Sequence, residues 1–350
     1  MGGSRKKPER RRGLNDQLPM TNSRLHIVNP RSSINREWWF PVCWTFQAAL
    51  RFGFLVLASA VFGNGPADSP KIVFEVTSAY HHIRVIDRGG LRTLSFDGSM
   101  ETQMLLENPL KGHFQYTEYF HTPWLWNPQL TNVLMIGLGG GSTQRAYEHY
   151  YPEVAIDTAE IDPMVAKIAR DYFHLHDSPT QRVHIADGRI FLRRSQGSYG
   201  AIILDAYVQH RYGSSIPYQL ATKEFFELAS NHLETNGVLA YNVIGTLHSG
   251  GTDLLGSLYK TLKAVFPEVY LFPARDTQNV VLIATKSPEK ADLNLLQQRA
   301  IPLLRSRRIT LPGFWNLLSA FRSFPPQNSS QCSVLTDDYA PVDGLLQTGY

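Results

Sequence analysis

Four short apolar runs between residues 132 and 205 each end in glycine or a carboxylate, and this feature constrains the fold most. The first run, 133–136, leads directly into the glycine-rich segment 137–142. The other three runs end in the following residues: Glu160, Asp187 followed by Gly188, and Asp205. Buried strands that alternate with helices form open parallel sheets, which bind ligands at the carboxyl ends of their strands. The pattern therefore predicts a doubly wound α/β sheet that binds a nucleoside.

The rest of the chain extends this prediction. Strand and helix patterns alternate from 132 to 285, with helices predicted at 143–150, 163–173, 189–194, 222–233 and 253–265. Further strands are predicted at 238–243, 269–272 and 280–284. Only residues 273–279 separate the last two strands, which is too short for a helical crossover, so these strands should be antiparallel. Seven strands with an antiparallel final hairpin are typical of AdoMet-dependent methyltransferases.

The chain divides into four predicted parts. Alternating polar and apolar residues with Gly-containing turns at Gly89-Gly90 and Gly98 predict a small antiparallel sheet before the main domain. The aromatic-rich segment 113–127 is predicted to be a helix that leads into that domain. The parts are a basic tail with an apolar segment (1–63), a small β domain (71–112), a Rossmann-like catalytic domain (113–288), and a helical tail with an Asp-Asp loop (289–350).

Charge and cysteine content exclude several classes of function. Residues 1–51 hold ten Lys and Arg against three acids, about +7, so the remainder carries about −3 of the total of +4. A mildly acidic folded part fits a cationic substrate and argues against nucleic acid. The only cysteines, Cys43 and Cys332, cannot build a disulfide framework or a cysteine metal site. No metal ligand set is predicted, because the adjacent His81 and His82 point to opposite faces of a strand.

The apolar segment within 38–63 has two interpretations. Its uninterrupted apolar core, 52–63, is 12 residues long, which is too short for a convincing membrane-spanning helix. Arg51 before it and the small residues Ala58, Ala60 and Gly63 near its end resemble a signal peptide or anchor, whereas a peripheral or packed segment is the alternative. The supply of a nucleotide cofactor favours the cytoplasm, and contact with a membrane through 38–63 stays open.

The glycine loop and the carboxylates distinguish between cofactors. Glu160 ends the strand after the loop, where a carboxylate accepts the ribose hydroxyls. The dinucleotide fingerprint needs Gly or Ala at its sixth position, where this chain has Ser142. The pair Asp187-Gly188 is foreign to that fingerprint and suits an adenine amino group. We therefore favour an AdoMet-type cofactor over NAD.

These residues resemble those of the spermidine/spermine synthases, the polyamine aminopropyltransferases, and in particular their divergent bacterial branch. The resemblance covers about 71–285 and adds the segments 78–80, 94–98, 116–118 and 222–226, with 335–343 typical of the divergent branch. It implies aminopropyl transfer from decarboxylated AdoMet to an amine such as putrescine, with release of methylthioadenosine, in a homo-oligomer. It assigns catalysis to Asp205 and Tyr116, and cofactor binding to Gly137, Gly139, Gly141, Glu160, Asp162, Asp187, Gly188 and His81.

Asp205 carries the chemistry in this interpretation. An alkylammonium with a pKa near 10.4 has no free lone pair, so a carboxylate must hold it and remove its proton. The resemblance implies that Asp205 does this and that Tyr116 helps to hold the amine.

The chain departs from the family pattern at four positions. Gly140 and Val208 replace two aspartates that bind the aminopropyl ammonium and the polyamine in the family. His81 stands where the family has Gln, and Thr117 stands where it has Gln or His. Loss of the aspartate at position 140 weakens selection against the carboxylate of intact AdoMet. The segment 207–215, which carries His210 and Arg211, is longer than in the family. Two alternatives therefore stay open: an AdoMet-dependent methyltransferase, and a non-catalytic protein that retains the nucleoside pocket.

Overall fold

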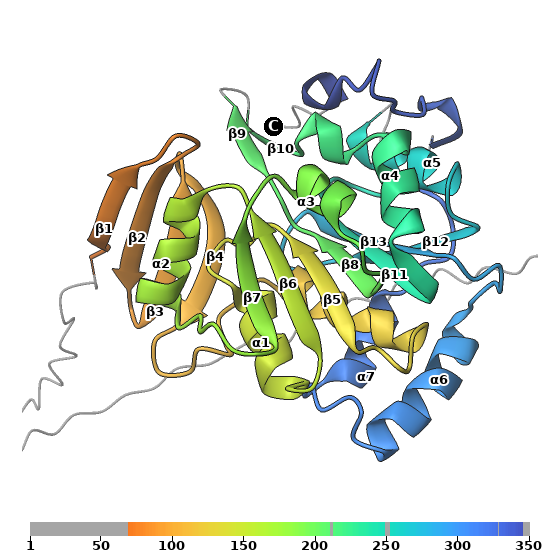
Figure 1. Cartoon of the computed structure of the whole chain (residues 1–350), viewed down its shortest axis with the longest axis horizontal. Helices are drawn as coiled ribbons and strands as arrows, with labels where there is room; N and C mark the ends of the chain where they lie inside the picture. Colours follow the sequence, from red (N-terminus) through yellow and green to blue (C-terminus); the bar gives the residue numbers. More distant parts are fainter. Residues whose placement is uncertain (1–68, 211–212, 249–252, 328, 346–350) are drawn as a thin grey trace, which may run out of the picture. The chain divides into compact units, whose positions relative to one another are not determined.

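A computed structural model describes residues 69–210, 213–248, 253–327 and 329–345 (Figure 1). The predictions for the tail 1–63, for membrane contact through 38–63, and for Arg211 lie outside these residues. No helix within the described ranges has the length and apolar character needed to cross a membrane.

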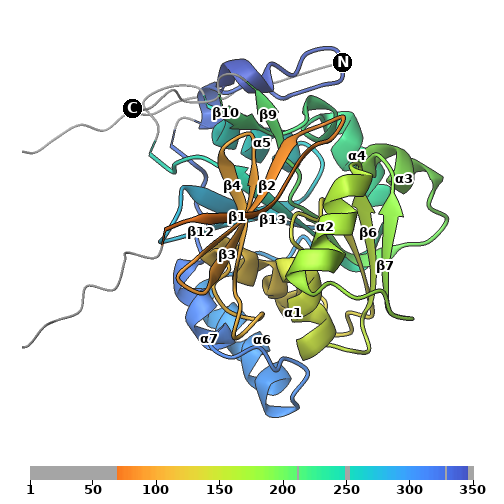
Figure 2. The ribbon, with the colours of Figure 1, turned by 90° about the vertical axis from the view of Figure 1, so that its left-hand side faces the viewer.

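The first sheet is a four-stranded antiparallel meander in the order β1-β2-β3-β4 (Figure 2). Its strands are β1 Lys71–Thr77, β2 His82–Arg88, β3 Leu91–Phe96 and β4 Ser99–Leu105. Gly89 and Gly90 adopt positive φ angles at the β2–β3 turn, as the Gly-Gly pair predicts. The predicted small antiparallel sheet is therefore present.

The second sheet has seven strands in the order β12-β13-β11-β8-β5-β6-β7. The strands are β5 Asn132–Ile136, β6 Ala155–Glu160, β7 Gln181–Ile185, β8 Tyr199–Leu204, β11 Leu233–Ile244, β12 Glu268–Pro273 and β13 Asn279–Thr285. β13 runs antiparallel to both neighbours and the other pairs are parallel, so the predicted antiparallel final hairpin is confirmed. The predicted α/β fold, with a Rossmann-like seven-stranded sheet after a small antiparallel sheet, is confirmed.

The helices begin where the sequence supplies caps. The α-helices are α1 Ser142–Tyr150, α2 Pro163–Phe173, α3 Gly188–Arg194, α4 Lys223–Asn231, α5 Leu254–Lys263, α6 Leu293–Arg305 and α7 Phe314–Leu317. Side chains of Asp162, Asp187, Thr222, Asp253 and Asp292 accept backbone N–H groups at five of these starts. A cap satisfies a donor that the first turn of a helix leaves free, which fixes where the helix starts.

Alternating side chains of the central strands divide the core into two faces. On β5, Val133 and Met135 pack into one cluster, whereas Leu134 and Ile136 pack into the other. The first cluster includes residues of α1, α6 and α7, and the second includes residues of α3, α4 and α5. A third cluster joins the small sheet to α2 and to Leu138 of the glycine loop. The small sheet is thereby packed against the glycine loop.

Three segments differ from the expectations. The aromatic segment forms a 3-10 helix, η1 Gln115–Leu125, with Pro123 inside it. The polar segment 207–215 forms a short antiparallel pair, β9 Val208–His210 and β10 Gly213–Ser215. The tail beyond 289 is not separate, because α6 and α7 join the first core cluster, and Leu335 and Val342 join the second. The remaining 3-10 helices are η2 Tyr218–Leu220, η3 Leu318–Ala320, η4 Ser329–Gln331 and η5 Val342–Leu345.

Candidate functional site

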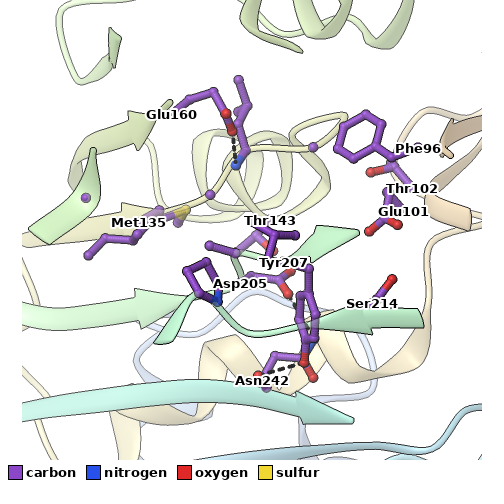
Figure 3. A pocket seen from close by; sticks show the side chains of 18 of the residues that line it. Phe96, Glu101, Thr102, Met135, Thr143, Glu160, Asp205, Tyr207, Ser214 and Asn242 are labelled. Carbon is purple, nitrogen blue, oxygen red and sulfur yellow. Dashed lines mark hydrogen bonds between the residues drawn. The ribbon is translucent and has the colours of Figure 1, made fainter. Parts of the chain in front are cut away.

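A cavity of about 500 Å³ lies at the carboxyl ends of the central strands (Figure 3). The chain order reverses between β5 and β8 at this edge, and such switch points are where open α/β sheets bind ligands. Side chains of β4, η1 and the β9–β10 hairpin complete the walls. The volume falls within the range of sites that hold drug-sized ligands.

Two glycines at the cavity cannot carry a side chain. Gly137 has a φ of +97°, and a Cβ there would lie 2.2 Å from the backbone oxygen of Asp205. A Cβ on Gly188 would lie 2.3 Å from a side-chain carbon of Ile136. Glycine at 137 therefore allows the ends of β5 and β8 to approach closely, and Gly139 lines the cavity beside it.

Glu160 connects the end of β6 to the glycine loop. Its carboxylate accepts the backbone N–H of Leu138 at 3.0 Å and that of Asp162 at 2.8 Å. Burial raises the pKa of Glu160 to about 7, and these backbone donors oppose the rise. Each oxygen keeps acceptor capacity for a ligand hydroxyl, so Glu160 can bind a ribose.

Asp187 and Gly188 line the cavity at the start of α3. One Asp187 oxygen accepts the Ile190 backbone N–H at 2.9 Å, which leaves acceptor capacity on the carboxylate. A ligand amino group is a suitable donor for it.

Asp205 follows β8 and lies at the centre of a hydrogen-bond network. Tyr116 of η1 donates its hydroxyl to one carboxylate oxygen at 3.2 Å, and Asn242 of β11 donates its amide to the other at 2.9 Å. Asn279 of β13 donates to the Asn242 amide oxygen at 2.9 Å, which fixes the orientation of that amide. Elements separated by up to 89 residues thus converge on one carboxylate.

The environment of Asp205 makes it a candidate proton acceptor. Burial raises the pKa of Asp205 to about 6, although the donors Asn242 and Tyr116 lower it again. Burial and the Asp205 charge also hold the pKa of Tyr116 well above its usual range, so Tyr116 stays a hydroxyl donor. A carboxylate with a pKa close to the working pH suits general base catalysis.

His81 lines the cavity and stacks on Phe96 with ring centroids 4.5 Å apart. Its Nδ1 lies 3.5 Å from a carboxylate oxygen of Asp97. The stacked rings form an apolar wall of the cavity beside the acidic groups.

Two of the predicted cofactor residues do not line the cavity. The buried Asp162 carboxylate caps α2 at Met164 and accepts the Ser78 hydroxyl, so it links the main domain to the small sheet. Gly141 is the N-cap of α1, and its positive φ of +72° belongs to the turn that leads into this helix. Neither residue is among those that line the cavity, so direct cofactor contact stays a prediction for both positions.

Several residues that line the cavity were not predicted as site residues from the sequence, namely Glu101, Tyr207, Asn242 and Asn279. Asn242 had a signal, since a lone amide in the apolar strand 238–243 needs a partner when it is buried. The hydroxyl of Tyr207 donates to the Asn242 backbone oxygen at 3.0 Å and accepts the Ile244 N–H at 3.1 Å. Nothing in the sequence indicated that Glu101 lines the cavity, because the direction of its side chain depends on a β-bulge in the pairing of β3 with β4.

The residues that depart from the family pattern lie at the cavity or next to it. Val208 and Thr117 line it, and the backbone N–H of Gly140 donates to the Thr102 hydroxyl at 2.8 Å. Val208 contributes an apolar side chain to the cavity wall at the position where the family pattern has an aspartate. The hydrogen bond at Gly140 places β4 against the glycine loop.

The segment 335–343 packs beside the site without lining it. Asp337 forms a two-pronged ion pair with Arg189 of α3, with N–O distances of 2.8 and 2.6 Å. Asp343 accepts the hydroxyl of Ser215 in the β9–β10 hairpin at 2.7 Å. The tail thereby holds α3 and the hairpin, which both border the cavity.

Comparisons with known proteins agree with this geometry. The family model described as Spermine/spermidine synthase domain matches residues 113–288. A polyamine aminopropyltransferase of Vibrio vulnificus is 30% identical over 307 residues, which cover 85% of this chain and 97% of that protein.

Two further similarities concern the scaffold. A probable spermidine synthase from Corynebacterium glutamicum has a similar fold, with a TM-score of 0.58 at 16% identity, covering 76% of this chain and 97% of that one. An eEF1A lysine and N-terminal methyltransferase of Xenopus laevis is 29% identical over 45% of this chain, but over only 23% of its own length. The scaffold is thus similar to enzymes that transfer different alkyl groups.

Proposed function

The chain belongs to the spermine/spermidine synthase family, and we propose that it transfers an aminopropyl group from decarboxylated AdoMet to a small amine such as putrescine. Family membership makes the chain a transferase of the polyamine aminopropyltransferase type. The donor, the acceptor and the residue roles are our proposal.

The network around Asp205 carries the proposal. A half-buried carboxylate with a pKa of about 6, aligned by Tyr116 and Asn242, is suited to holding an alkylammonium and accepting its proton. The freed amine then attacks the carbon next to the sulfonium. A carbon–nitrogen bond forms, the carbon–sulfur bond breaks, and its electron pair converts the sulfonium into neutral methylthioadenosine.

The other end of the cavity suits the nucleoside. Glu160 would accept the ribose hydroxyls and Asp187 would accept the adenine amino group, while Gly137 and Gly139 allow the backbone to approach the donor. Holding donor and acceptor in one cavity aligns the reacting atoms, which is a large part of catalysis in alkyl transfer.

Methyl transfer from intact AdoMet is the second candidate. Gly140 and Val208 remove two carboxylates that favour a polyamine and a decarboxylated donor. The similarity to the Xenopus methyltransferase supports methyl transfer, but this similarity covers only 45% of the chain. The same residue, Asp205, would deprotonate the amine in either reaction.

The test uses the full chain with decarboxylated AdoMet and putrescine. We expect release of methylthioadenosine together with an aminopropylated amine. Asp205→Asn should lower turnover by 100-fold or more yet bind methylthioadenosine as the parent does, whereas the exposed control Asp177→Asn should keep full turnover. Full turnover in Asp205→Asn would refute the mechanism. Binding of the nucleoside without any transfer, in the parent chain, would favour the non-catalytic alternative.

A further inference from the structure

A β-bulge in the small sheet directs Glu101 toward the cavity. On the paired strands β3 and β4, Leu94 lies opposite Thr102 and Ser95 lies opposite Met100. Glu101, between Met100 and Thr102, therefore has no residue opposite it on β3. Neighbouring side chains of a regular strand point to opposite faces, but a bulge redirects one of them. Both Glu101 and Thr102 consequently line the cavity, and Figure 3 shows them on the same wall.

The bulge lies against the glycine loop at the position where the family aspartate is missing. Thr102 accepts the Gly140 backbone N–H at 2.8 Å. A Cβ on residue 140 would lie 2.7 Å from the Thr102 methyl carbon and 2.9 Å from the ring of Phe173. A larger side chain at 140 would therefore clash, while Glu101 brings a carboxylate to the same part of the cavity from β4.

None of the described residues that line the cavity is a Lys or an Arg. Among the described residues, no Lys, Arg or His forms an ion pair with Glu101. Burial raises the pKa of Glu101 to about 7, the Ser99 hydroxyl opposes the rise, and the charges of Asp205 and Asp97 add to it. Two half-buried carboxylates that face one cavity are costly until a cationic ligand binds between them.

We propose that Glu101 binds the primary ammonium of the aminopropyl group and thereby selects decarboxylated over intact AdoMet. This inference rests on the proposed function and names the residue that takes over the task of the missing carboxylate at position 140. A carboxylate here attracts the ammonium and repels the extra carboxylate of intact AdoMet, and such repulsion is an effective source of specificity. We assign the donor rather than the acceptor because β4 borders the glycine loop.

The test compares three ligands by calorimetry on the full chain: decarboxylated AdoMet, intact AdoMet and methylthioadenosine. The variants are Glu101→Gln, Glu101→Asp, and the control Glu107→Gln in the exposed turn after β4. Methylthioadenosine has no ammonium and no carboxylate, so its affinity reports whether the nucleoside pocket is intact.

We expect the parent chain and Glu107→Gln to prefer decarboxylated AdoMet by tenfold or more. Glu101→Gln should lower that preference at least tenfold while methylthioadenosine affinity stays within twofold, and Glu101→Asp should keep most of the preference. An unchanged preference in Glu101→Gln overturns the inference and leaves the proposed function standing. A parent chain that prefers intact AdoMet overturns both. A rise in the KM for putrescine alone would assign Glu101 to the acceptor and also overturn the inference.

Discussion

Replacing Asn242 should move the acid limb of the pH–rate profile. The Asn242 amide donates to Asp205 at 2.9 Å and is the strongest influence that lowers the Asp205 pKa. A hydrogen bond to a charged group contributes about 1.5–3 kcal/mol, and 1.36 kcal/mol corresponds to one pKa unit. Asn242→Leu keeps a similar volume without the donor, so the Asp205 pKa should rise from about 6 by about one to two units.

The assay is kcat/KM for putrescine, at saturating decarboxylated AdoMet, as a function of pH. Because the mechanism needs ionised Asp205, kcat/KM should fall about tenfold per pH unit below its pKa. At pH 6 the variant should be about 5- to 50-fold slower than the parent, and the two profiles should converge above about pH 9.

A matched control separates this effect from a general loss of folding. Asn236 lies on the same strand, β11, at its exposed end, so Asn236→Leu should leave the profile unchanged. The assignment of Asp205 as the ionising base would be refuted if Asn242→Leu had the same melting temperature as the parent and the acid limb of its pH–rate profile did not move.

Three further predictions concern the same site. Tyr116→Phe removes a hydrogen-bond donor to ionised Asp205, so kcat should fall by about 10- to 100-fold. The affinity for methylthioadenosine, measured by calorimetry, should not change. A kcat within twofold of the parent would count against a catalytic role for Tyr116. Glu160→Gln places an amide beside the backbone donors of Leu138 and Asp162, so methylthioadenosine should bind at least about tenfold more weakly, and equal affinity would rule out a ribose role. Asp205→Asn should raise the free energy of unfolding relative to the parent at pH 8 but not at pH 4, by roughly 3 kcal/mol at most, as measured by chemical unfolding. The reason is that a carboxyl group whose pKa is raised in the folded state destabilises the fold as the pH rises from about 4 to about 6. A gain at pH 4 as large as that at pH 8 would contradict the raised pKa.

The sheet could be predicted because its central strands are short and uniformly apolar. The runs 133–136 and 201–204 are buried on both faces, so their composition alone identifies them. β11 begins at Leu233 rather than at 238, because the exposed Thr235 and Asn236 hide its first half. The β9–β10 pair was missed for the same reason, since its polar sequence has no apolar alternation.

The site was predicted where a strand end specifies the position of a side chain. Glu160 ends its strand, and Asp187 and Asp205 follow theirs, so a common location at one sheet edge could be inferred. The resemblance, rather than any local pattern, supplied Tyr116, which meets Asp205 across 89 residues. Glu101 could not be predicted, because a bulge depends on strand pairing and not on the local sequence.

The central claim is the identity of the transferred group. The purified full chain should be given equal concentrations of decarboxylated and intact AdoMet together with putrescine, and both nucleoside products should be measured by mass spectrometry. Our account predicts methylthioadenosine and an aminopropylated putrescine as the dominant products, at least tenfold above S-adenosylhomocysteine. Dominant S-adenosylhomocysteine with a methylated amine would contradict it and establish methyl transfer on this scaffold.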